Sequence, residues 1–289
     1  MKSLRPIEHV IDSQIAPVGT FTVRRALPDR SRHSVGPWVF LDHFGPFPVK
    51  AGGKDGVGAH PHAGIETVTY LLSGRNEHRD SAGHHGVVSA GGAQWMSAGR
   101  GIVHSERPLV ESESELTQHG IQLWTTLPRA LKMMPPRYQR IDAASIPAVV
   151  QGATTVRVIA GEYAGAKGPA DTVMPLFLWH ATIAAGGAFE ALVPGSFEVA
   201  AYVIDGEASM GGAVARGAVK GQLVTWKDEE GTIRIANGGT ARLEVLVLGG
   251  APAEGPLVFH GPFVMNSAQQ VRAAELAYRN GQMGVLEED

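Results

Sequence analysis

The sequence contains no cysteine among its 289 residues. That absence excludes disulfide bonds, thiolate metal ligands, thiol nucleophiles and any redox switch based on a thiol. The sequence also lacks a membrane-spanning apolar run, because the uncharged stretch 172–189 is broken by Pro175, His180 and a Gly-Gly pair. The N-terminus has scattered charges and no apolar segment typical of a signal peptide. We therefore expect a cytoplasmic protein without a membrane segment.

The sequence also has no large excess of charge of either sign. The 25 Lys and Arg residues nearly balance the 28 Asp and Glu residues, which gives a net charge of −3. No block of like charge supplies an electrostatic footprint for nucleic acid or a polybasic patch for a membrane surface. The 37 glycines and 18 prolines, with only 18% charged residues, favour many turns and buried strands over long surface helices.

Short runs of β-branched and aromatic residues recur along the chain. Residues 66–72 (ETVTYLL) form one such run, which ends at the turn signal Ser73-Gly74. Seven further runs have the same character: 86–89, 120–124, 155–159, 176–179, 197–204, 222–226 and 241–248. This spacing predicts an all-β protein built from sandwiches or barrels, and it argues against βαβ units.

Two turn-rich stretches suggest a division into halves. The stretch 126–136 ends in Pro135 and Pro136, which cannot donate hydrogen bonds to a strand ladder, and 161–169 contains three glycines and a proline. The predicted strands fall in similar numbers on either side. We therefore expect two β domains, residues 1–135 and 136–289.

One α-helix is predicted near the C-terminus. Ser267 suits the N-cap, and Gln270 three residues later completes an S-x-x-Q capping box. An apolar stripe follows from Val271 through Ala274 to Tyr278, and Asn280-Gly281 then forms a stop signal. We expect this helix to serve a packing role.

The histidines are unevenly distributed. Nine of the twelve lie in the stretch 33–119, and two patterns stand out: His60-Pro-His62 and His104-Ser-Glu106. Residues i and i+2 of a strand point to the same face. If these two segments are neighbouring strands, three imidazole nitrogens and one carboxylate oxygen converge.

Such a donor set suits a divalent transition metal. Structural zinc sites are more often rich in cysteine and closed, whereas this set leaves positions for water or substrate. The alternative is that the histidines lie on polar strand faces, where they are hydrogen-bonded or solvated.

Longer motifs extend around these residues. They are HPHAGIETVTYLLSG (60–74), DSAGHHGVVSAGGAQWMSAGRGIVHSERP (80–108), HGPFVMN (260–266), FLDHFGP (40–46), VIAGEYAG (158–165) and LVLGGAPAEGPLVFHGPF (246–263). Together they resemble the pirin family of the cupin superfamily over nearly the whole chain.

The resemblance implies a fold and a metal site. It predicts two cupin-type β-barrels with a short C-terminal helix: a metal-binding barrel in 1–135 and a metal-free barrel plus helix in 136–289. Pirin ligands occupy the positions that are His60, His62, His104 and Glu106 here. The family metal is usually taken as iron, so we expect Fe(II), although Zn, Ni, Mn or Cu would suit the same ligands.

Glu66 is open to several interpretations. It shares strand parity with His60 and His62, so a regular strand would direct it into the cavity. It is then a pocket carboxylate that orients a ligand imidazole, a direct ligand as in other cupins, or a structural residue. Glu66 and Glu106 are the two candidates for a catalytic base.

The resemblance also suggests an activity. Pirins of this type resemble quercetin 2,3-dioxygenases, which open a flavonol ring with O2 and release carbon monoxide. The implied partners are a small aromatic substrate and O2, and we expect a monomer that does not bind nucleic acid directly. Two alternatives stay open: an iron-binding regulator that senses redox state through protein partners, and a bicupin that has lost its metal.

Overall fold

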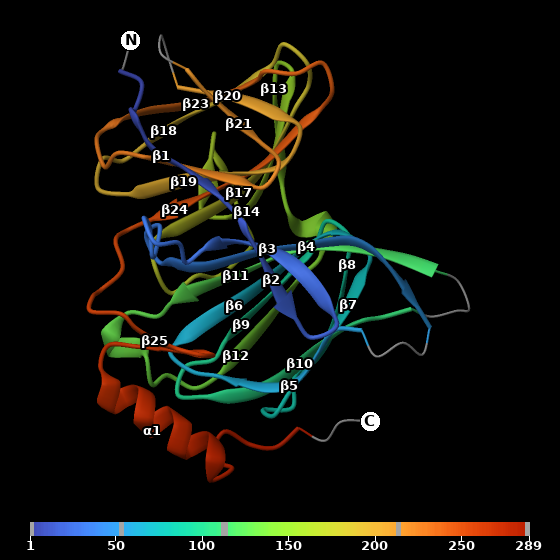
Figure 1. The fold of residues 1–289 in the computed structure, drawn as a ribbon, viewed down its shortest axis with the longest axis vertical. Coiled ribbons are helices and arrows are strands. Elements are labelled where there is room, and N and C mark those ends of the chain that lie inside the picture. The colour runs from blue at the N-terminus through green and yellow to red at the C-terminus, as the bar shows by residue number, and fades with distance from the viewer. Residues whose placement is uncertain (1–2, 52–54, 111–114, 212–214, 287–289) are drawn as a thin grey trace. The chain divides into compact units, whose positions relative to one another are not determined.

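The structure is a computed structural model that describes residues 3–51, 55–110, 115–211 and 215–286, and these residues are mainly β-strand (Figure 1). The predicted all-β class is confirmed. The run predicted at 66–72 is strand β6 (Ile65–Ser73), and the run predicted at 222–226 is β22 (Gln222–Trp226). Residues 127–136 of the stretch 126–136 form a break between strands, as its prolines predict, and they contain only a short 3-10 turn (Arg129–Leu131).

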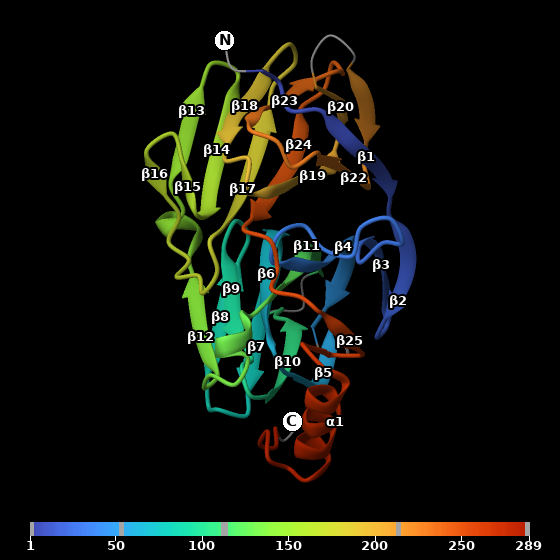
Figure 2. The same cartoon turned by 90° about the vertical axis from the view of Figure 1, so that its left-hand side faces the viewer.

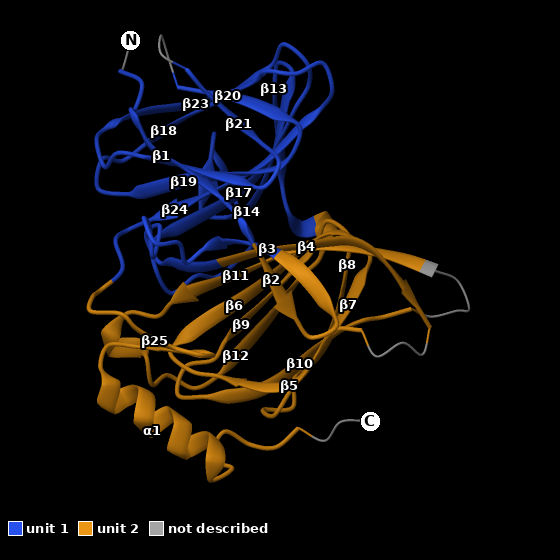
Figure 3. Ribbon diagram, viewed as in Figure 1, with its two compact units in different colours: residues 1–14, 24–40, 145–253 blue, residues 15–23, 41–144, 254–289 orange. Residues whose placement is uncertain are grey.

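The chain forms two compact units, each assembled from three segments (Figure 3). Unit 1 consists of Met1–Gln14, Arg24–Phe40 and Ser145–Ala253, and unit 2 of Ile15–Val23, Leu41–Ala144 and Glu254–Asp289. A single boundary between residues 135 and 136 does not describe this exchange of segments. The C-terminal helix belongs to unit 2, with the histidine motifs, and not to the unit that holds most of the second half of the chain.

Unit 1 is built on a seven-stranded and a four-stranded antiparallel sheet, with a small hairpin. The larger sheet has the order β1 (Ile7–Asp12), β22, β19 (Glu198–Asp205), β24 (Leu243–Gly250), β17 (Leu176–Ile183), β14 (Thr154–Ala160) and β13 (Ala148–Gln151). The smaller sheet has the order β18 (Ala188–Val193), β23 (Gly231–Asn237), β20 (Glu207–Met210) and β21 (Arg216–Val219), and the hairpin pairs β15 (Glu162–Tyr163) with β16 (Ala166–Lys167). Apolar side chains, among them Phe177, Trp179 and Phe189, form one buried cluster in this unit.

Unit 2 repeats the plan with a second pair of sheets. Its larger sheet has the order β12 (Arg137–Ile141), β9 (Ala93–Ser97), β6, β11 (Glu115–Thr126), β4 (Trp38–Lys50), β3 (Phe21–Leu27) and β2 (Gln14–Val18). Its smaller sheet has the order β5 (Val57–His62), β10 (Ile102–Pro108), β7 (Arg75–Asp80) and β8 (His85–Ser89). The two units share one strand order, in which β5 and β10 of unit 2 take the places of β18 and β23 of unit 1.

The last segment of the chain packs within unit 2. A short hairpin of β25 (Val258–His260) and β26 (Phe263–Met265) precedes helix α1 (Ala268–Arg279), as Figure 2 shows. Ser267 caps the helix by accepting a hydrogen bond from the Gln270 amide at 3.2 Å, as the capping box predicts. Val271 and Ala274 are buried against β26 and the start of β10, but Tyr278 is 42% exposed, so the predicted apolar stripe ends one turn early.

No helix in the described part of the chain is long and apolar enough to cross a membrane.

Candidate metal centre

Two antiparallel strands bring the histidine motifs together. His60 and His62 lie at the end of β5, two residues apart, and β5 pairs with β10 so that His104 lies directly opposite His60. Cross-strand partners point to the same face of a sheet. The alternation predicted from the sequence therefore directs all three imidazoles into one space.

The three imidazoles face one another through their Nε2 atoms. The Nε2 atom of His60 is 3.1 Å from Nε2 of His62 and 3.0 Å from Nε2 of His104. Among the described residues, only this group of three or more potential ligands has donor atoms that all lie within 4.8 Å of one another. The sequence prediction of a three-histidine cluster is confirmed.

The other ring nitrogen of each histidine is already occupied. Nδ1 of His60 lies 2.8 Å from the carbonyl oxygen of Gly58, and Nδ1 of His62 lies 3.0 Å from that of Pro262. A carbonyl oxygen only accepts hydrogen bonds, so these two Nδ1 atoms carry the protons. The Nε2 lone pairs then point at the shared centre, which is the tautomer a metal ligand requires.

Burial keeps the rings of His62 and His104 neutral. His62 and His104 are buried. Burial, with the neighbouring His60, lowers the pKa of His62 to about 3, and burial together with the other histidines lowers the pKa of His104 well below its usual value. Both rings are therefore neutral near pH 7 and present lone pairs to the centre.

This geometry fits a single transition metal. Two ligands at right angles on a metal with bonds of about 2.1 Å are separated by about 3.0 Å, which matches the observed nitrogen separations. Three imidazoles without a thiolate suit a borderline divalent metal, and they leave the remaining positions open.

Glu106, the fourth predicted ligand, is engaged elsewhere in the structure. It follows His104 on β10, but the register of β10 against β5 shifts between these two residues. Its carboxylate accepts a hydrogen bond from the Thr69 hydroxyl and another from the Gln94 amide at 3.0 Å. The group of converging donor atoms contains the three histidines without Glu106. A direct ligand role for Glu106 thus stays a prediction.

Glu66 is buried in a separate polar cluster. It accepts hydrogen bonds from Ser97 at 2.6 Å and Thr125 at 3.2 Å, its cross-strand partners on β9 and β11. The Arg137 guanidinium lies 3.6 Å from its carboxylate. Burial nevertheless raises the pKa of Glu66.

Glu66 points away from the histidines. The next residue, Thr67, lies opposite Trp124, whose ring meets that of His62 edge-on at 4.9 Å between centroids. Successive side chains of a strand point to opposite faces, so Glu66 lies on the other face of the sheet. The shared parity with His60 and His62 gave the wrong orientation for Glu66, because β5 ends at His62 and the chain turns at Gly64 (φ +76°) into a different sheet. The structure therefore does not place Glu66 among the pocket carboxylates.

Residues that the motif analysis did not single out lie beside His104. Its Nδ1 atom is 3.5 Å from Nδ1 of His78, and Nε2 of His78 is 3.0 Å from Asp80. Burial, the largest influence on Asp80, raises its pKa, but hydrogen bonds from His78 and His84 outweigh burial and lower it. The sequence signal is a second His-x-acid pair on a strand, His78-x-Asp80, whose importance depends on the pairing of β7 with β10.

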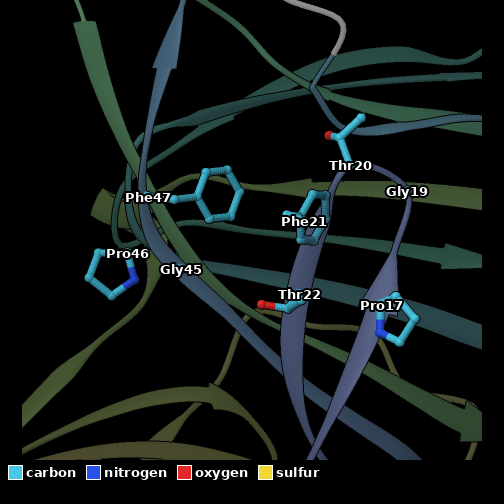
Figure 4. Close-up of a pocket in the computed structure, with 8 residues that line it drawn as sticks. All are labelled: Pro17, Gly19, Thr20, Phe21, Thr22, Gly45, Pro46 and Phe47. Carbon is cyan, nitrogen blue, oxygen red and sulfur yellow. The ribbon is translucent and has the colours of Figure 1, made fainter.

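A surface pocket lies elsewhere in unit 2. It has a volume of about 550 Å³ and is formed by the β2–β3 hairpin and the middle of β4 (Figure 4). Its lining residues are Pro17, Gly19, Thr20, Phe21, Thr22, Gly45, Pro46 and Phe47. None of them is a predicted ligand, so this pocket is distinct from the three-histidine centre.

Comparison with known proteins shows the family and the fold of this chain. The Pirin family model matches residues 20–125, and the model described as the Pirin C-terminal cupin domain matches residues 178–284. A protein of Pseudomonas aeruginosa named "Putative quercetin 2,3-dioxygenase" is 37% identical over 255 residues, which cover 86% of each chain.

Solved structures of similar proteins have the same fold. A crystal structure of quercetin 2,3-dioxygenase from Acinetobacter baumannii superposes with a TM-score of 0.90 at 30% identity, covering 99% of this chain and all of that one. A bacterial pirin from Escherichia coli in complex with nickel(II) has a TM-score of 0.66 at 22% identity and covers 85% of this chain and 99% of its own, which shows a shared fold.

Fold and site together define a protein of two cupin-type barrels with a three-histidine centre in one of them. The chain belongs to the pirin family.

Proposed function

We propose that this chain is a metal-dependent dioxygenase that acts on a flavonol-like aromatic substrate with O2. In this proposal Fe(II) is held by His60, His62 and His104, with Glu106 as the fourth ligand. Similarity to the Acinetobacter quercetin 2,3-dioxygenase over essentially the full length of both chains supports the reaction class.

One observation carries the proposal more than any other. The Nε2 atom of His60 lies 3.1 Å from that of His62 and 3.0 Å from that of His104, while carbonyl oxygens hold the protons of His60 and His62 on the far side of their rings. Converging lone pairs repel one another unless a cation lies between them. This arrangement is costly in a protein without a metal and favourable in one with it.

The bound metal would supply Lewis acidity, which lowers the pKa of a substrate hydroxyl, and open coordination positions for the reactants. The protein supplies the surroundings. His62 and His104 are buried, which limits access of water, and the Trp124 ring beside His62 offers an apolar face to an aromatic substrate.

Glu106 is the candidate base in this proposal, as a weakly held ligand that can leave the metal. Gln94 and Thr69 donate hydrogen bonds to its carboxylate, and both lie on the sheet face that also presents Trp124. A carboxylate oriented in this way can accept the proton of a substrate hydroxyl when the hydroxyl comes within hydrogen-bonding distance. Glu66 is left out, because it lies on the opposite face of the sheet.

Oxygen uptake tests the proposal. The protein is loaded anaerobically with Fe(II), its metal content is determined by mass spectrometry, and O2 consumption is followed after quercetin is added. We expect turnover that is lost in His104→Ala and kept in His85→Ala, which alters an exposed histidine paired with Glu77.

Full iron occupancy without O2 consumption, with quercetin and with related flavonols, would overturn the dioxygenase proposal. That result would favour the regulator that senses redox state through its iron.

A further inference from the structure

A chain of side chains leads away from the three-histidine centre towards the surface of unit 2. It starts at His104, passes through His78 and Asp80, and ends at His84. The side chains of His78 and Asp80 are 2% and 0% exposed, and that of His84 is 38% exposed. The pairing of β10 with β7, which sets His104 opposite Asp80, holds the first three residues together.

The proton positions along this chain of side chains follow from Asp80, whose carboxylate accepts the hydrogen bonds. The Oδ1 atom of Asp80 accepts hydrogen bonds from the backbone amides of Ala82 and His84, each at 3.0 Å. Its Oδ2 atom lies 3.0 Å from Nε2 of His78. An ionised carboxylate can only accept, so Nε2 of His78 carries a proton. When the ring carries this single proton, Nδ1 of His78 has a free lone pair and can accept a hydrogen bond from Nδ1 of His104, which lies 3.5 Å away.

The ring of His78 is held in this orientation by stacking. Tyr138 lies parallel to it, with 4.4 Å between ring centroids and 14° between ring planes. Gly86 leaves the space that Tyr138 fills, because a Cβ atom there would lie 2.3 Å from the Tyr138 hydroxyl. The hydroxyl donates to Gln94 at 3.2 Å. A flip of the His78 ring would have to disturb these contacts.

His104 differs from His60 and His62 in the kind of group that lies against its Nδ1 atom. Backbone carbonyls hold the Nδ1 protons of His60 and His62, and a carbonyl cannot become a donor. The partner of His104 is another imidazole, which can accept or donate depending on its own tautomer. The state of His104 therefore depends on a residue beyond its immediate neighbour.

We propose that Asp80, acting through His78, is a positioning residue that selects the metal-binding tautomer of His104. The proposal rests on the role of His104 as a ligand in the proposed function. It extends that function by two residues that bind no metal themselves but determine whether Nε2 of His104 has a free lone pair.

Asp80→Asn is the sharpest test, because the turn selects how the new amide is oriented. The backbone amides of Ala82 and His84 need an acceptor, so the amide oxygen takes the place of Oδ1 and the NH2 group faces His78. Nε2 of His78 then accepts, its Nδ1 donates to His104, and the proton of His104 moves to Nε2, where it blocks the metal.

Two readouts follow the change without measuring turnover. Long-range proton–nitrogen NMR spectra of the metal-free protein report the tautomer of His104, and titration with Co(II) reports affinity. We expect the proton on Nδ1 in the wild type and on Nε2 in Asp80→Asn, with Co(II) bound about 10- to 100-fold more weakly, as for other residues that support a metal ligand.

Glu77→Gln is the matched control. Glu77 lies on the same strand as Asp80 and also binds a histidine, His85 at 2.8 Å, but this pair has no hydrogen bond to His78 or His104. We expect an unchanged His104 tautomer and unchanged Co(II) affinity in this variant.

His78→Phe is a second variant that leaves the turn and its Asp80 cap in place. It keeps an aromatic ring for Tyr138 to stack on and removes the acceptor for His104. Weaker Co(II) binding and a mixture of His104 tautomers would support the proposal. Wild-type affinity and an unchanged tautomer in either folded variant would overturn it. Because neither readout involves oxygen, a wild-type protein that fails to turn over quercetin would leave this result unaffected.

Discussion

The two units build the same strand order around different interiors. In unit 1 the strands β18 and β23 direct apolar side chains inward, including Phe189, Ile233 and Ile235, all 1% exposed or less. At the same places in unit 2, β5 and β10 direct histidines inward. One interior is filled by packing, and the other leaves three nitrogen lone pairs facing a common point.

The difference shows how much stability from apolar burial a barrel gives up when its interior holds a polar site. Interiors filled with apolar side chains gain stability from burial, about 25 cal/mol per Å² of apolar surface. Buried polar groups do not provide this stabilisation, and they need hydrogen-bond partners inside the protein. In unit 2 these partners are supplied by the carbonyls of Gly58 and Pro262 and by side chains such as His78. Unit 2 should therefore respond to substitution mainly through metal binding, and unit 1 mainly through stability.

Removal of a ligand should have the largest effect. In His62→Ala we expect metal affinity to fall by more than about 100-fold, beyond the loss seen when only a supporting residue is removed. The fold should persist, because strand pairing positions the site without the metal. Metal content by mass spectrometry and circular dichroism on one sample test both statements. Stoichiometric metal in this variant would contradict the three-histidine centre.

Truncation of the unit 1 interior should show the opposite pattern. Phe189→Ala should lower the free energy of unfolding by about 3–5 kcal/mol, through lost burial and the cavity left behind, with metal affinity unchanged. Urea unfolding and Co(II) titration measure the two quantities. Leu192 on the same strand is 52% exposed, so Leu192→Ala should stay within about 0.5 kcal/mol of the wild type. Equal losses in both variants would show that the interior of unit 1 does not carry its stability.

Lys132, a buried amine in unit 2, should produce a smaller, pH-dependent effect. Its Nζ donates to Gly64 and Val264 carbonyls and to Thr126, at 2.6–2.8 Å, and burial lowers its pKa to about 7. The unfolded chain, with a lysine pKa of about 10.4, binds this proton more tightly than the folded protein. Stability should therefore rise between pH 7 and 9, by up to about 1.4 kcal/mol per pH unit.

Urea unfolding at pH 7, 8 and 9 measures this slope, which should disappear in Lys132→Met. Lys220→Met removes an exposed lysine paired with Asp205 and should keep the wild-type slope. The same slope in both variants would assign the effect to another group.

Local patterns in the sequence predicted much of the fold. Helix α1 starts at its predicted cap, Ser267, because capping depends on residues adjacent in sequence. Most predicted strands also lie where alternation and turn residues place them. The division into units was not accessible in this way, because β1 at the start of the chain pairs with β22, more than 200 residues later.

The site shows the same limit. His60, His62 and His104 could be found because residues two apart on a strand share a face. The cavity-facing orientation expected of Glu66 does not hold, because that rule does not extend through the turn at Gly64 into another sheet. Glu106 follows a register shift that no local pattern reveals.

The sequence by itself determined the β architecture, the C-terminal helix, the family and the three histidines, since each depends on short-range periodicity or on motifs. Only the tertiary structure decided that Glu66 lies on the sheet face away from the histidines and which groups lie against the Nδ1 atoms of the three imidazoles. Those relations are set by strand register and by contacts between distant segments, such as Pro262 with His62 and His78 with His104.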